Sequence, residues 1–298
     1  MKNIMTAENP KIGGILPALL TPFGRDGGIN TDALERLIDW NIEKGVNGFY
    51  VGGSTAEAFL LAEEERSLVY EVAAKATAGR VPLIAHVGSI STEQAIRFAR
   101  TAERLGYSAV SAIAPFYYKF SFNQIKRYYF DIADATGLPM IIYNFPNFSG
   151  VNLTVEQVSE FFADSRFIGI KHTSNDFFSL EQFKSRFPEK TVLNGFDEML
   201  LCGLTMGADG GVGSTYNFMA EKYTELYRLF RAGDLHAARE IQKECNRIIG
   251  VLCRVGVMEG EKEVLCQLGF DFGSARPPFS HLSAEQKDLL RHEITEKL

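Results

Sequence analysis

The chain has 298 residues, of which 46% are hydrophobic and 23% charged, an ordinary globular composition that can bury a large core. Its formal net charge of −6 argues against nucleic acid or an anionic membrane surface as a partner. No apolar run reaches the length of a membrane span, and residues 1–6 lack the apolar stretch of a signal peptide.

Eight short apolar segments recur along the chain. The first six are rich in β-branched and aliphatic residues, as strands buried on both faces require. The last two are weaker, and the eighth consists mostly of glycine, so its assignment rests on its place in the alternation. We predict strands at residues 14–20, 48–51, 82–87, 109–114, 139–143, 167–171, 192–194 and 210–213.

Helical segments separate these strands. Gly45 follows an amphipathic stretch, as is typical after a helix end. Ser91 with Gln94, and Thr154 with Gln157, have the spacing of a capping box at a helix start. The predicted helices lie at residues 31–44, from Ser91 to Leu105, after Thr154, and at residues 177–187, 197–206 and 220–230.

Alternating strands and helices with short connections predict a parallel sheet, and eight such units predict an α/β fold of the (β/α)8 TIM barrel type. We assign residues 1–233 to this barrel. The pattern then becomes helical, with predicted helices at 236–255, 259–268 and 283–296, the last capped by Ser283. No Gly-, Ser- or Pro-rich linker precedes them, so residues 234–298 are expected to form a helical extension packed on the barrel.

The cysteines and histidines carry no metal-binding pattern. The four cysteines include no CxxC pair, which favours free thiols and a reduced, cytoplasmic protein. The five histidines are scattered without the spacing of metal ligands, so we predict no metal.

A lysine closes the sixth apolar segment at Lys171. Lysine is rarely buried, because moving an ammonium out of water is costly. The fifth segment ends in Tyr143, so an amine and a phenol are expected to share one pocket if the two strands are neighbours. A buried lysine with a lowered pKa is the nucleophile that Schiff-base chemistry needs. The alternative interpretation is a lysine that extends to solvent from a strand end.

Active sites of such barrels lie at the C-terminal ends of the strands, where further polar groups occur here. After the second strand, Ser54 and Thr55 follow two glycines and offer hydroxyl and N–H donors to an anion, although a helix N-cap is the alternative. After the fourth strand, Tyr117 belongs to an aromatic rim that packing alone also explains.

The seventh and eighth strands lead into more polar residues. Asp197 and Glu198 follow the seventh, where acids in the first turn of a helix are the alternative interpretation. Ser214 follows the glycine-rich eighth strand, a place where barrels often bind phosphate, but residues 210–214 contain no basic side chain. Together these positions predict one pocket with an amine, a phenol, an anion site and a polar wall.

These residues resemble the pyruvate-dependent class I aldolases, the family that includes N-acetylneuraminate lyase and dihydrodipicolinate synthase. The resemblance covers essentially the whole chain. It is carried by Tyr50-Val51-Gly52-Gly53-Ser54-Thr55, Ala85-His86-Val87-Gly88, Tyr143-Asn144-Phe145-Pro146, Gly169-Ile170-Lys171-His172-Thr173 and Gly213-Ser214-Thr215-Tyr216-Asn217.

The resemblance implies a role for each candidate residue. Lys171 would form the Schiff base, Tyr143 would be the general acid/base, and Tyr117 would complete the proton relay from a neighbouring subunit. A phenol is expected to exchange protons in this way once a neighbouring group lowers its pKa. Ser54 and Thr55 would hold the pyruvyl carboxylate. The sugar chain would be bound by Thr173, Gly195, Asp197, Glu198 and Ser214.

Within the family the sequence is most similar to the N-acetylneuraminate lyase branch. Dihydrodipicolinate synthases typically have an arginine for a second carboxylate where this chain has Phe148, and the Asp197-Glu198 pair suits a neutral polyol. The resemblance implies a cofactor-free homotetramer that cleaves N-acetylneuraminate reversibly to pyruvate and N-acetylmannosamine. One departure is Ala56, which replaces a glycine usual in the family and fits only if φ is negative and a methyl group has room.

Two alternatives remain at this point. Another aldolase or synthase of the same family would act on a different sugar 2-oxo acid or on aspartate semialdehyde. A non-catalytic barrel would bind a ligand without needing Lys171 and Tyr143 together.

Overall fold

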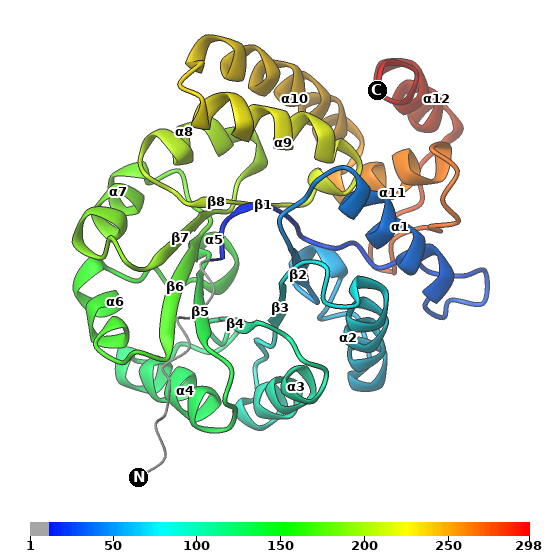
Figure 1. Ribbon diagram of the computed structural model, residues 1–298. Coiled ribbons are helices and arrows are strands. Elements are labelled where there is room, and N and C mark those ends of the chain that lie inside the picture. Colours follow the sequence, from blue (N-terminus) through cyan, green and yellow to red (C-terminus); the bar gives the residue numbers. More distant parts are fainter. Residues whose placement is uncertain (1–11) are drawn as a thin grey trace.

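In a computed structural model that describes residues 12–298, eight parallel strands form a ring enclosed by helices (Figure 1). The strands pair in the order β1-β8-β7-β6-β5-β4-β3-β2, and the Leu19 N–H donates to the Tyr50 carbonyl at 2.9 Å to close the ring between β1 and β2. The predicted (β/α)8 barrel is therefore confirmed. The strands are β1 (Gly14–Pro17), β2 (Phe49–Val51), β3 (Leu83–His86), β4 (Ala109–Ile113), β5 (Met140–Asn144), β6 (Phe167–His172), β7 (Thr191–Asn194) and β8 (Gly210–Gly213).

The weak eighth segment is a true strand. Its glycines allow close approach, because a Cβ on Gly210 would lie 2.1 Å from the carbonyl oxygen of Gly14 on β1. The segment therefore completes the barrel without side chains of its own to fill the space. The prediction about residues 1–6 falls outside the described residues.

Helices cover the outside of the ring. Ser91 and Thr154 cap α3 and α6 as predicted, each accepting a hydrogen bond from the residue three positions later, and Gly45 has the expected positive φ of 83° after α1. The elements between the strands are α1 (Thr31–Glu43), η1 (Ser54–Ala56), α2 (Glu63–Thr77), α3 (Thr92–Arg104), α4 (Phe122–Asp134), α5 (Pro146–Ser149), α6 (Val155–Phe162), α7 (Phe177–Arg186), η2 (Asp197–Met199), α8 (Leu200–Thr205) and α9 (Tyr216–Arg231).

Several helices differ from the prediction. The helix expected at residues 197–206 is divided into the 3₁₀ turn η2 and α8, and the one expected at residues 220–230 begins earlier, at Tyr216, with a backbone break at Met219. The sequence prediction did not include α2 or α4. Ala62 offers no side-chain acceptor at the start of α2, whereas Ser121 forms a capping box at the start of α4 that was available as a signal.

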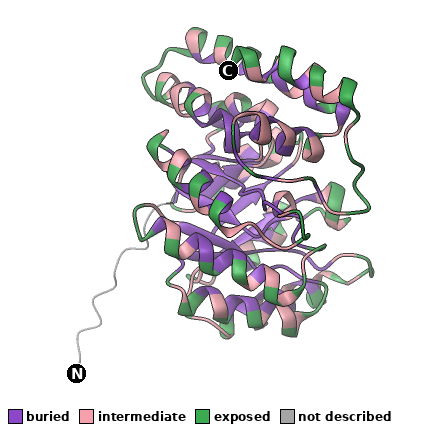
Figure 2. Cartoon of the chain, turned by 90° about the vertical axis from the view of Figure 1, so that its right-hand side faces the viewer, coloured by how far each residue is buried: buried purple, intermediate pink, exposed green. Residues whose placement is uncertain are grey.

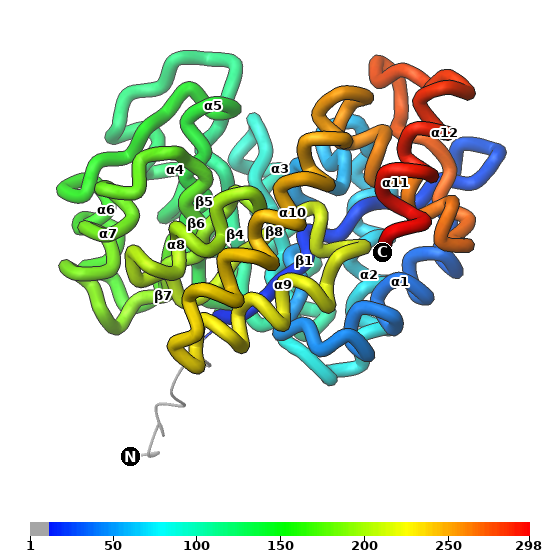
Figure 3. Tube along the Cα trace, turned by 90° about the horizontal axis from the view of Figure 1, so that it is seen from above, coloured from blue at the N-terminus to red at the C-terminus, as the bar shows by residue number. Residues whose placement is uncertain are grey.

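Three further helices, α10 (Leu235–Val255), α11 (Val257–Gln267) and α12 (Ala284–Glu293), follow the barrel and end in the 3₁₀ turn η3 (Thr295–Lys297). They correspond to the predicted C-terminal helices, and Ser283 caps α12. α10 packs along α9, and α11 and α12 continue beside it on one side of the barrel (Figure 3). Within residues 12–298, no helix is both long and apolar enough to cross a membrane.

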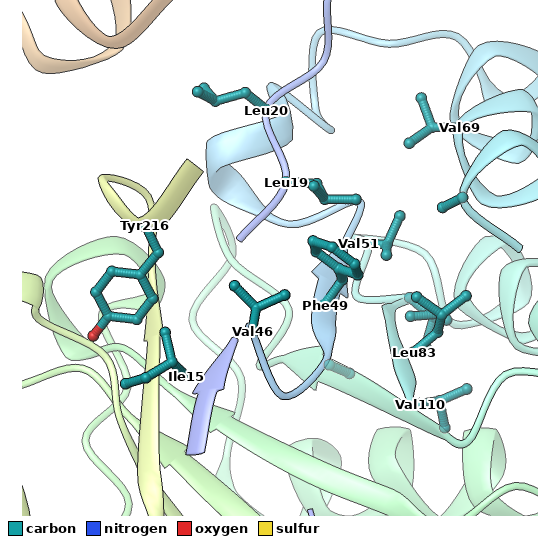
Figure 4. Packing of buried hydrophobic residues seen from close by; sticks show 14 of the residues in the cluster. Ile15, Leu19, Leu20, Val46, Phe49, Val51, Val69, Leu83, Val110 and Tyr216 are labelled. Carbon is teal, nitrogen blue, oxygen red and sulfur yellow. The ribbon is translucent and has the colours of Figure 1, made fainter. Parts of the chain in front are cut away.

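Apolar side chains form two layers. The larger one lies between the strands and the helices and includes Ile15, Phe49 and Val51 (Figure 4). The smaller one fills the barrel interior and includes Leu16 and Tyr50, the alternate residues of the same strands. Along β1 and β2, alternation thus sends every second side chain into the interior. Figure 2 shows the buried strands at the centre and exposed positions on the outer faces of the helices.

A buried ion pair joins the C-terminal helices to the loop after β2. Lys262 Nζ on α11 lies 2.5 Å from Glu57 Oε1, and neither side chain is exposed to solvent. The other carboxylate oxygen of Glu57 accepts the Arg276 N–H at 2.7 Å. Two charges removed from water stabilise each other only while both are present, so this pair holds α11 against the loop.

We expect Lys262→Met to lower the free energy of unfolding by about 3–5 kcal/mol, because it leaves the Glu57 carboxylate buried without its cation. Urea denaturation monitored by circular dichroism measures the change. The matched control is Lys126→Met, which breaks a partly exposed pair with Glu160 and should cost no more than about 1 kcal/mol. Equal losses in the two variants would contradict a special role for the buried pair.

Candidate active site

The amine and the phenol predicted from two strand ends lie side by side. β5 and β6 are neighbours, and Tyr143 pairs in register with Lys171. A register shift near Met140 places Ile168 and Lys171 toward the interior while Ile170 packs on the outer layer. Because paired residues of parallel strands point to the same face, both functional groups enter the C-terminal end of the barrel interior.

The Lys171 amine is enclosed by aromatic rings. The side chain is 5% exposed, and Nζ lies 4.1 Å from the ring centroid of Tyr143 and 4.4 Å from that of Tyr50. Burial lowers the pKa of Lys171 to about 7, and the negative charge of Asp197 partly offsets this shift. A large fraction of the amine is therefore neutral and nucleophilic near pH 7.

The pKa of the Tyr143 phenol is shifted in the direction opposite to the expected one. Burial raises its pKa well above the ordinary value, although the nearby hydroxyls of Thr173 and Ser54 oppose the rise. The expectation of a lowered pKa for Tyr143 is therefore wrong, because the effect of desolvation outweighs that of the two hydroxyls. In the free protein Tyr143 is a protonated acid, and it becomes a base only after it has donated its proton.

The loop after β2 places two hydroxyl residues at the same end. Gly52 has a φ of +73°, and a Cβ there would lie 2.6 Å from the Tyr70 ring, so glycine is required. Ser54 and Thr55 then begin the 3₁₀ turn η1, whose N-cap is Gly53, so the alternative of an N-cap by either hydroxyl residue is wrong. The buried Ser54 Oγ makes no hydrogen bond of good geometry within the described residues, although it lies near enough to the Tyr143 phenol to oppose the rise in its pKa, and a ligand can satisfy it.

Ala56 is compatible with this loop. Positive φ occurs at the next residue, Glu57, where φ is 56°, and not at Ala56 itself. The Ala56 methyl is fully buried, and its carbonyl accepts a hydrogen bond from Thr21 Oγ1 at 2.8 Å. The replacement of the usual glycine therefore causes no backbone strain.

His86 supports the loop from beneath, a role that the sequence argument did not assign. The ring is fully buried, with Nδ1 3.2 Å from the Gly52 carbonyl oxygen and Nε2 accepting the Ile113 N–H at 3.2 Å. Burial and the Arg66 cation hold its pKa well below the ordinary range, so the imidazole is neutral.

Asp197 is held by the segment between β8 and α9. Its Oδ2 accepts hydrogen bonds from the backbone N–H and the hydroxyl of Thr215, both at 2.7 Å, and a Cβ on Gly213 would lie 2.3 Å from its Oδ1. Burial raises the pKa of Asp197 to about 6 despite these bonds. A neighbouring acid and the lack of a basic side chain in residues 210–214 both disfavour a phosphate at this segment.

Gly195 and Thr173 directly follow the C-terminal ends of β7 and β6 and pack against each other. A Cβ on Gly195 would lie 1.8 Å from Thr173 Oγ1, so only glycine fits. The buried Thr173 Oγ1 has no hydrogen-bond partner among the described residues, as is true of Ser54 Oγ. The hydroxyl residues Ser54 and Thr173 line the same cavity, as is typical of polar groups that a ligand satisfies.

One cavity of about 620 Å³ joins nearly all of these groups. Among the residues that line it, the sequence argument selected Ser54, Thr55, Tyr143, Lys171, Thr173, Gly195, Asp197, Glu198 and Ser214. It missed the contribution of the C-terminal helices, because no sequence pattern places a helix beyond the barrel over the barrel mouth. Those residues include Cys253, Met258 and Glu261, with Phe279 from the segment after α11.

Tyr117 lies outside this cavity. Its side chain is 85% exposed, and its φ of +79° is unusual for a residue other than glycine. Tyr118 and Phe148 are also largely exposed nearby on the same rim of loops. The single chain therefore does not bring Tyr117 to Lys171. Within residues 12–298, no cluster of three His, Cys, Asp or Glu side chains could hold a metal ion.

Comparison with known proteins identifies the family. The model of the dihydrodipicolinate synthetase family matches residues 11–297. An N-acetylneuraminate lyase of Rhizobium meliloti (strain 1021) is 42% identical over 284 residues, which cover 95% of each chain.

Two solved structures share the fold throughout. N-acetylneuraminate lyase from Fusobacterium nucleatum complexed with pyruvate has a TM-score of 0.91 and 38% identity, covering 96% of this chain and 97% of that one. The catalytic lysine mutant of Ruminococcus gnavus sialic acid aldolase has a TM-score of 0.92 and 31% identity, covering 98% and 96%. With matches of this extent in sequence and structure, the chain belongs to the dihydrodipicolinate synthetase family.

Proposed function

We propose that this protein is an N-acetylneuraminate lyase, a Schiff-base aldolase that cleaves N-acetylneuraminate reversibly to pyruvate and N-acetylmannosamine. The observation that carries the proposal is the buried Lys171 amine, with a pKa of about 7, paired in register with Tyr143. The similar lyases and the catalytic lysine named for the Ruminococcus gnavus aldolase support it. The proposed reaction needs no cofactor.

The reaction begins when the neutral Lys171 amine attacks the ketone carbon of the open-chain 2-oxo acid. Tyr143 donates its proton to the departing oxygen, and water leaves as the imine forms. The protonated imine accepts the electron pair of the bond between the α and β carbons, while the Tyr143 phenolate takes the proton of the β hydroxyl. N-acetylmannosamine leaves as the aldehyde. The remaining enamine is protonated on carbon and hydrolysed to pyruvate and free Lys171.

The polar groups around the cavity would bind the two ends of the substrate. Ser54 and Thr55 hold the carboxylate of the 2-oxo acid, because an unsatisfied hydroxyl lies there within reach of the Lys171 pocket. The sugar hydroxyls donate to Asp197 and Glu198, since carboxylates accept hydrogen bonds from such groups. Thr173, Gly195 and Ser214 line the same part of the cavity.

The alternative substrates are less well suited to this cavity. A second carboxylate, as in aspartate semialdehyde, would need a cation near the Phe148 position, where an apolar ring packs 4.2 Å from Phe145. A barrel that only binds a ligand would have no need of a lysine desolvated beside a phenol. All four cysteines are free thiols, which favours a reducing compartment such as the cytoplasm.

We also propose a homotetramer in which Tyr117 reaches the site of a neighbouring subunit. Tyr117, Tyr118 and Phe148 form an exposed aromatic rim next to clefts lined by Phe59 and Phe116. Exposed apolar groups of this extent are typical of an interface between proteins. Tyr117 has a left-handed backbone and is 85% exposed, so its ring is available to a neighbouring subunit.

Removal of the nucleophile tests the proposed function. We expect the parent protein to release pyruvate from N-acetylneuraminate and Lys171→Ala to lose more than about 10³-fold of this activity, as nucleophile removal does in other covalent enzymes. Pyruvate with cyanoborohydride should add one reduced adduct to the parent, located at Lys171 by peptide mass spectrometry. The matched control is Lys190→Ala at the opposite end of the sheet, where Nζ donates to the Phe167 carbonyl. If the parent forms the adduct but leaves N-acetylneuraminate intact, the substrate assignment is wrong.

The rate of adduct formation should depend on pH near neutrality. Only the neutral amine attacks, so the rate at low pyruvate concentration should rise with pH through about 7 and then level, whereas an ordinary lysine would continue to gain reactivity up to its usual pKa. Asp197→Asn removes the charge that raises the pKa of Lys171, so the inflection should move to lower pH. An inflection that stays in place in Asp197→Asn would contradict this electrostatic account.

The contribution of Tyr117 across an interface can be tested by complementation. Tyr117→Phe and Lys171→Ala should each be nearly inactive alone. Co-expressed in equal amounts, they should recover about a quarter of parental activity, because half of the sites keep Lys171 and half of those face an intact Tyr117 in a symmetric oligomer. Pyruvate release by the purified mixed oligomer is the measurement. No recovery in mixed oligomers verified by native mass spectrometry would place Tyr117 outside the relay.

A further inference from the structure

A third acid lies in the wall of the cavity, on a helix beyond the barrel. Gly256, with a φ of +106°, turns the chain between α10 and α11 so that the start of α11 lines the cavity. Glu261 on α11 is fully buried, and its Oε1 accepts a hydrogen bond from Ser214 Oγ at 2.6 Å. This contact joins the C-terminal helices to the end of β8.

The other carboxyl oxygen of Glu261 is unsatisfied. Oε2 is buried and has no hydrogen-bond partner among the described residues. The adjacent Lys262 does not neutralise it, because Lys262 is paired with Glu57. Burial, together with the charge of Asp197, raises the pKa of Glu261 to about 8, so the group is a neutral acid at pH 7. A buried polar oxygen left unpaired is costly, and structural packing alone gives no reason to keep it.

The hydrogen bond with Glu261 also fixes how Ser214 meets a ligand. With its hydroxyl proton directed to Glu261, Ser214 presents lone pairs to the cavity and favours a ligand that donates hydrogen bonds. Ser214 follows β8, two strands from Lys171 on β6, and neighbouring strands are about 5 Å apart, so the backbones of the two residues lie roughly 10 Å apart. Ser214 therefore faces the part of a ligand that is remote from the 2-oxo group.

We propose that Glu261 is a positioning residue that acts through Ser214 and selects substrates whose remote end carries hydroxyl or amide donors. This inference rests on the proposed function and adds to it the specificity of one part of the site. The acids Asp197 and Glu198 on the same wall disfavour a carboxylate or phosphate at this position of the substrate.

The two ends of the site can be tested separately in the condensation reaction, because pyruvate and N-acetylmannosamine are separate substrates and each has its own KM. In Glu261→Leu we expect the KM for N-acetylmannosamine to rise about tenfold, as loss of one hydrogen bond to the ligand would predict, while the KM for pyruvate changes less than about twofold. Glu261→Gln keeps the shape and an acceptor for Ser214, so it should restore the KM for N-acetylmannosamine to near the parental value.

The pathway through Ser214 is tested by a double-mutant cycle. Ser214→Ala should reproduce the defect for N-acetylmannosamine alone, and the double variant Ser214→Ala/Glu261→Leu should be no worse than either single variant. The matched control is Glu263→Leu on the same helix, which breaks an ion pair with Lys287 outside the cavity and should leave both KM values unchanged.

The outcomes are distinguishable. If Glu261→Leu raises both KM values equally, or if its effect adds to that of Ser214→Ala, Glu261 is merely structural and the proposal is overturned. If Glu261→Leu does not fold, an unchanged KM for N-acetylmannosamine in Ser214→Ala overturns it as well. A parent protein that forms the pyruvate adduct but does not condense pyruvate with N-acetylmannosamine overturns the proposed function and, with it, this inference.

Discussion

The burial of one amine in an apolar barrel interior is the constraint on which the rest of the structure depends. Beyond a register shift between β5 and β6, Lys171 points into the barrel interior, next to the apolar side chains that fill it. There the rings of Tyr50 and Tyr143 replace water around Nζ. Because a desolvated ammonium is costly, the pKa of Lys171 falls and the neutral amine is favoured. Burial of this side chain, which is unfavourable for an ammonium, thus makes the amine nucleophilic.

The charged groups near this amine are engaged in contacts of their own. Asp197 is close enough to raise the pKa of Lys171, but its own carboxylate is occupied by Thr215. Glu57, in the loop that carries Ser54, and Lys262 form a buried ion pair with each other. Lys171 forms no ion pair within residues 12–298, and the charge of Asp197 raises its pKa less than burial lowers it.

The helices beyond the barrel are part of the site. α11 contributes Glu261 to the cavity wall and Lys262 to the loop after β2, although the two residues are adjacent in sequence. A helix places consecutive side chains about 100° apart, so one element can contact two different parts of the barrel mouth. A (β/α)8 ring alone would leave the remote end of the cavity open.

The sequence by itself determined the barrel, the strand ends and the neighbouring positions of Lys171 and Tyr143, because local periodicity and the rule of parallel connection leave few alternatives. It also contained the Ser121 capping box at the start of α4, a local signal that the prediction passed over. Only the tertiary structure decided the direction of the Tyr143 pKa, the exposed position of Tyr117 and the place of Glu261 against Ser214. Desolvation and contacts between elements distant in the chain set these properties, and neither is encoded in the spacing of residues along it.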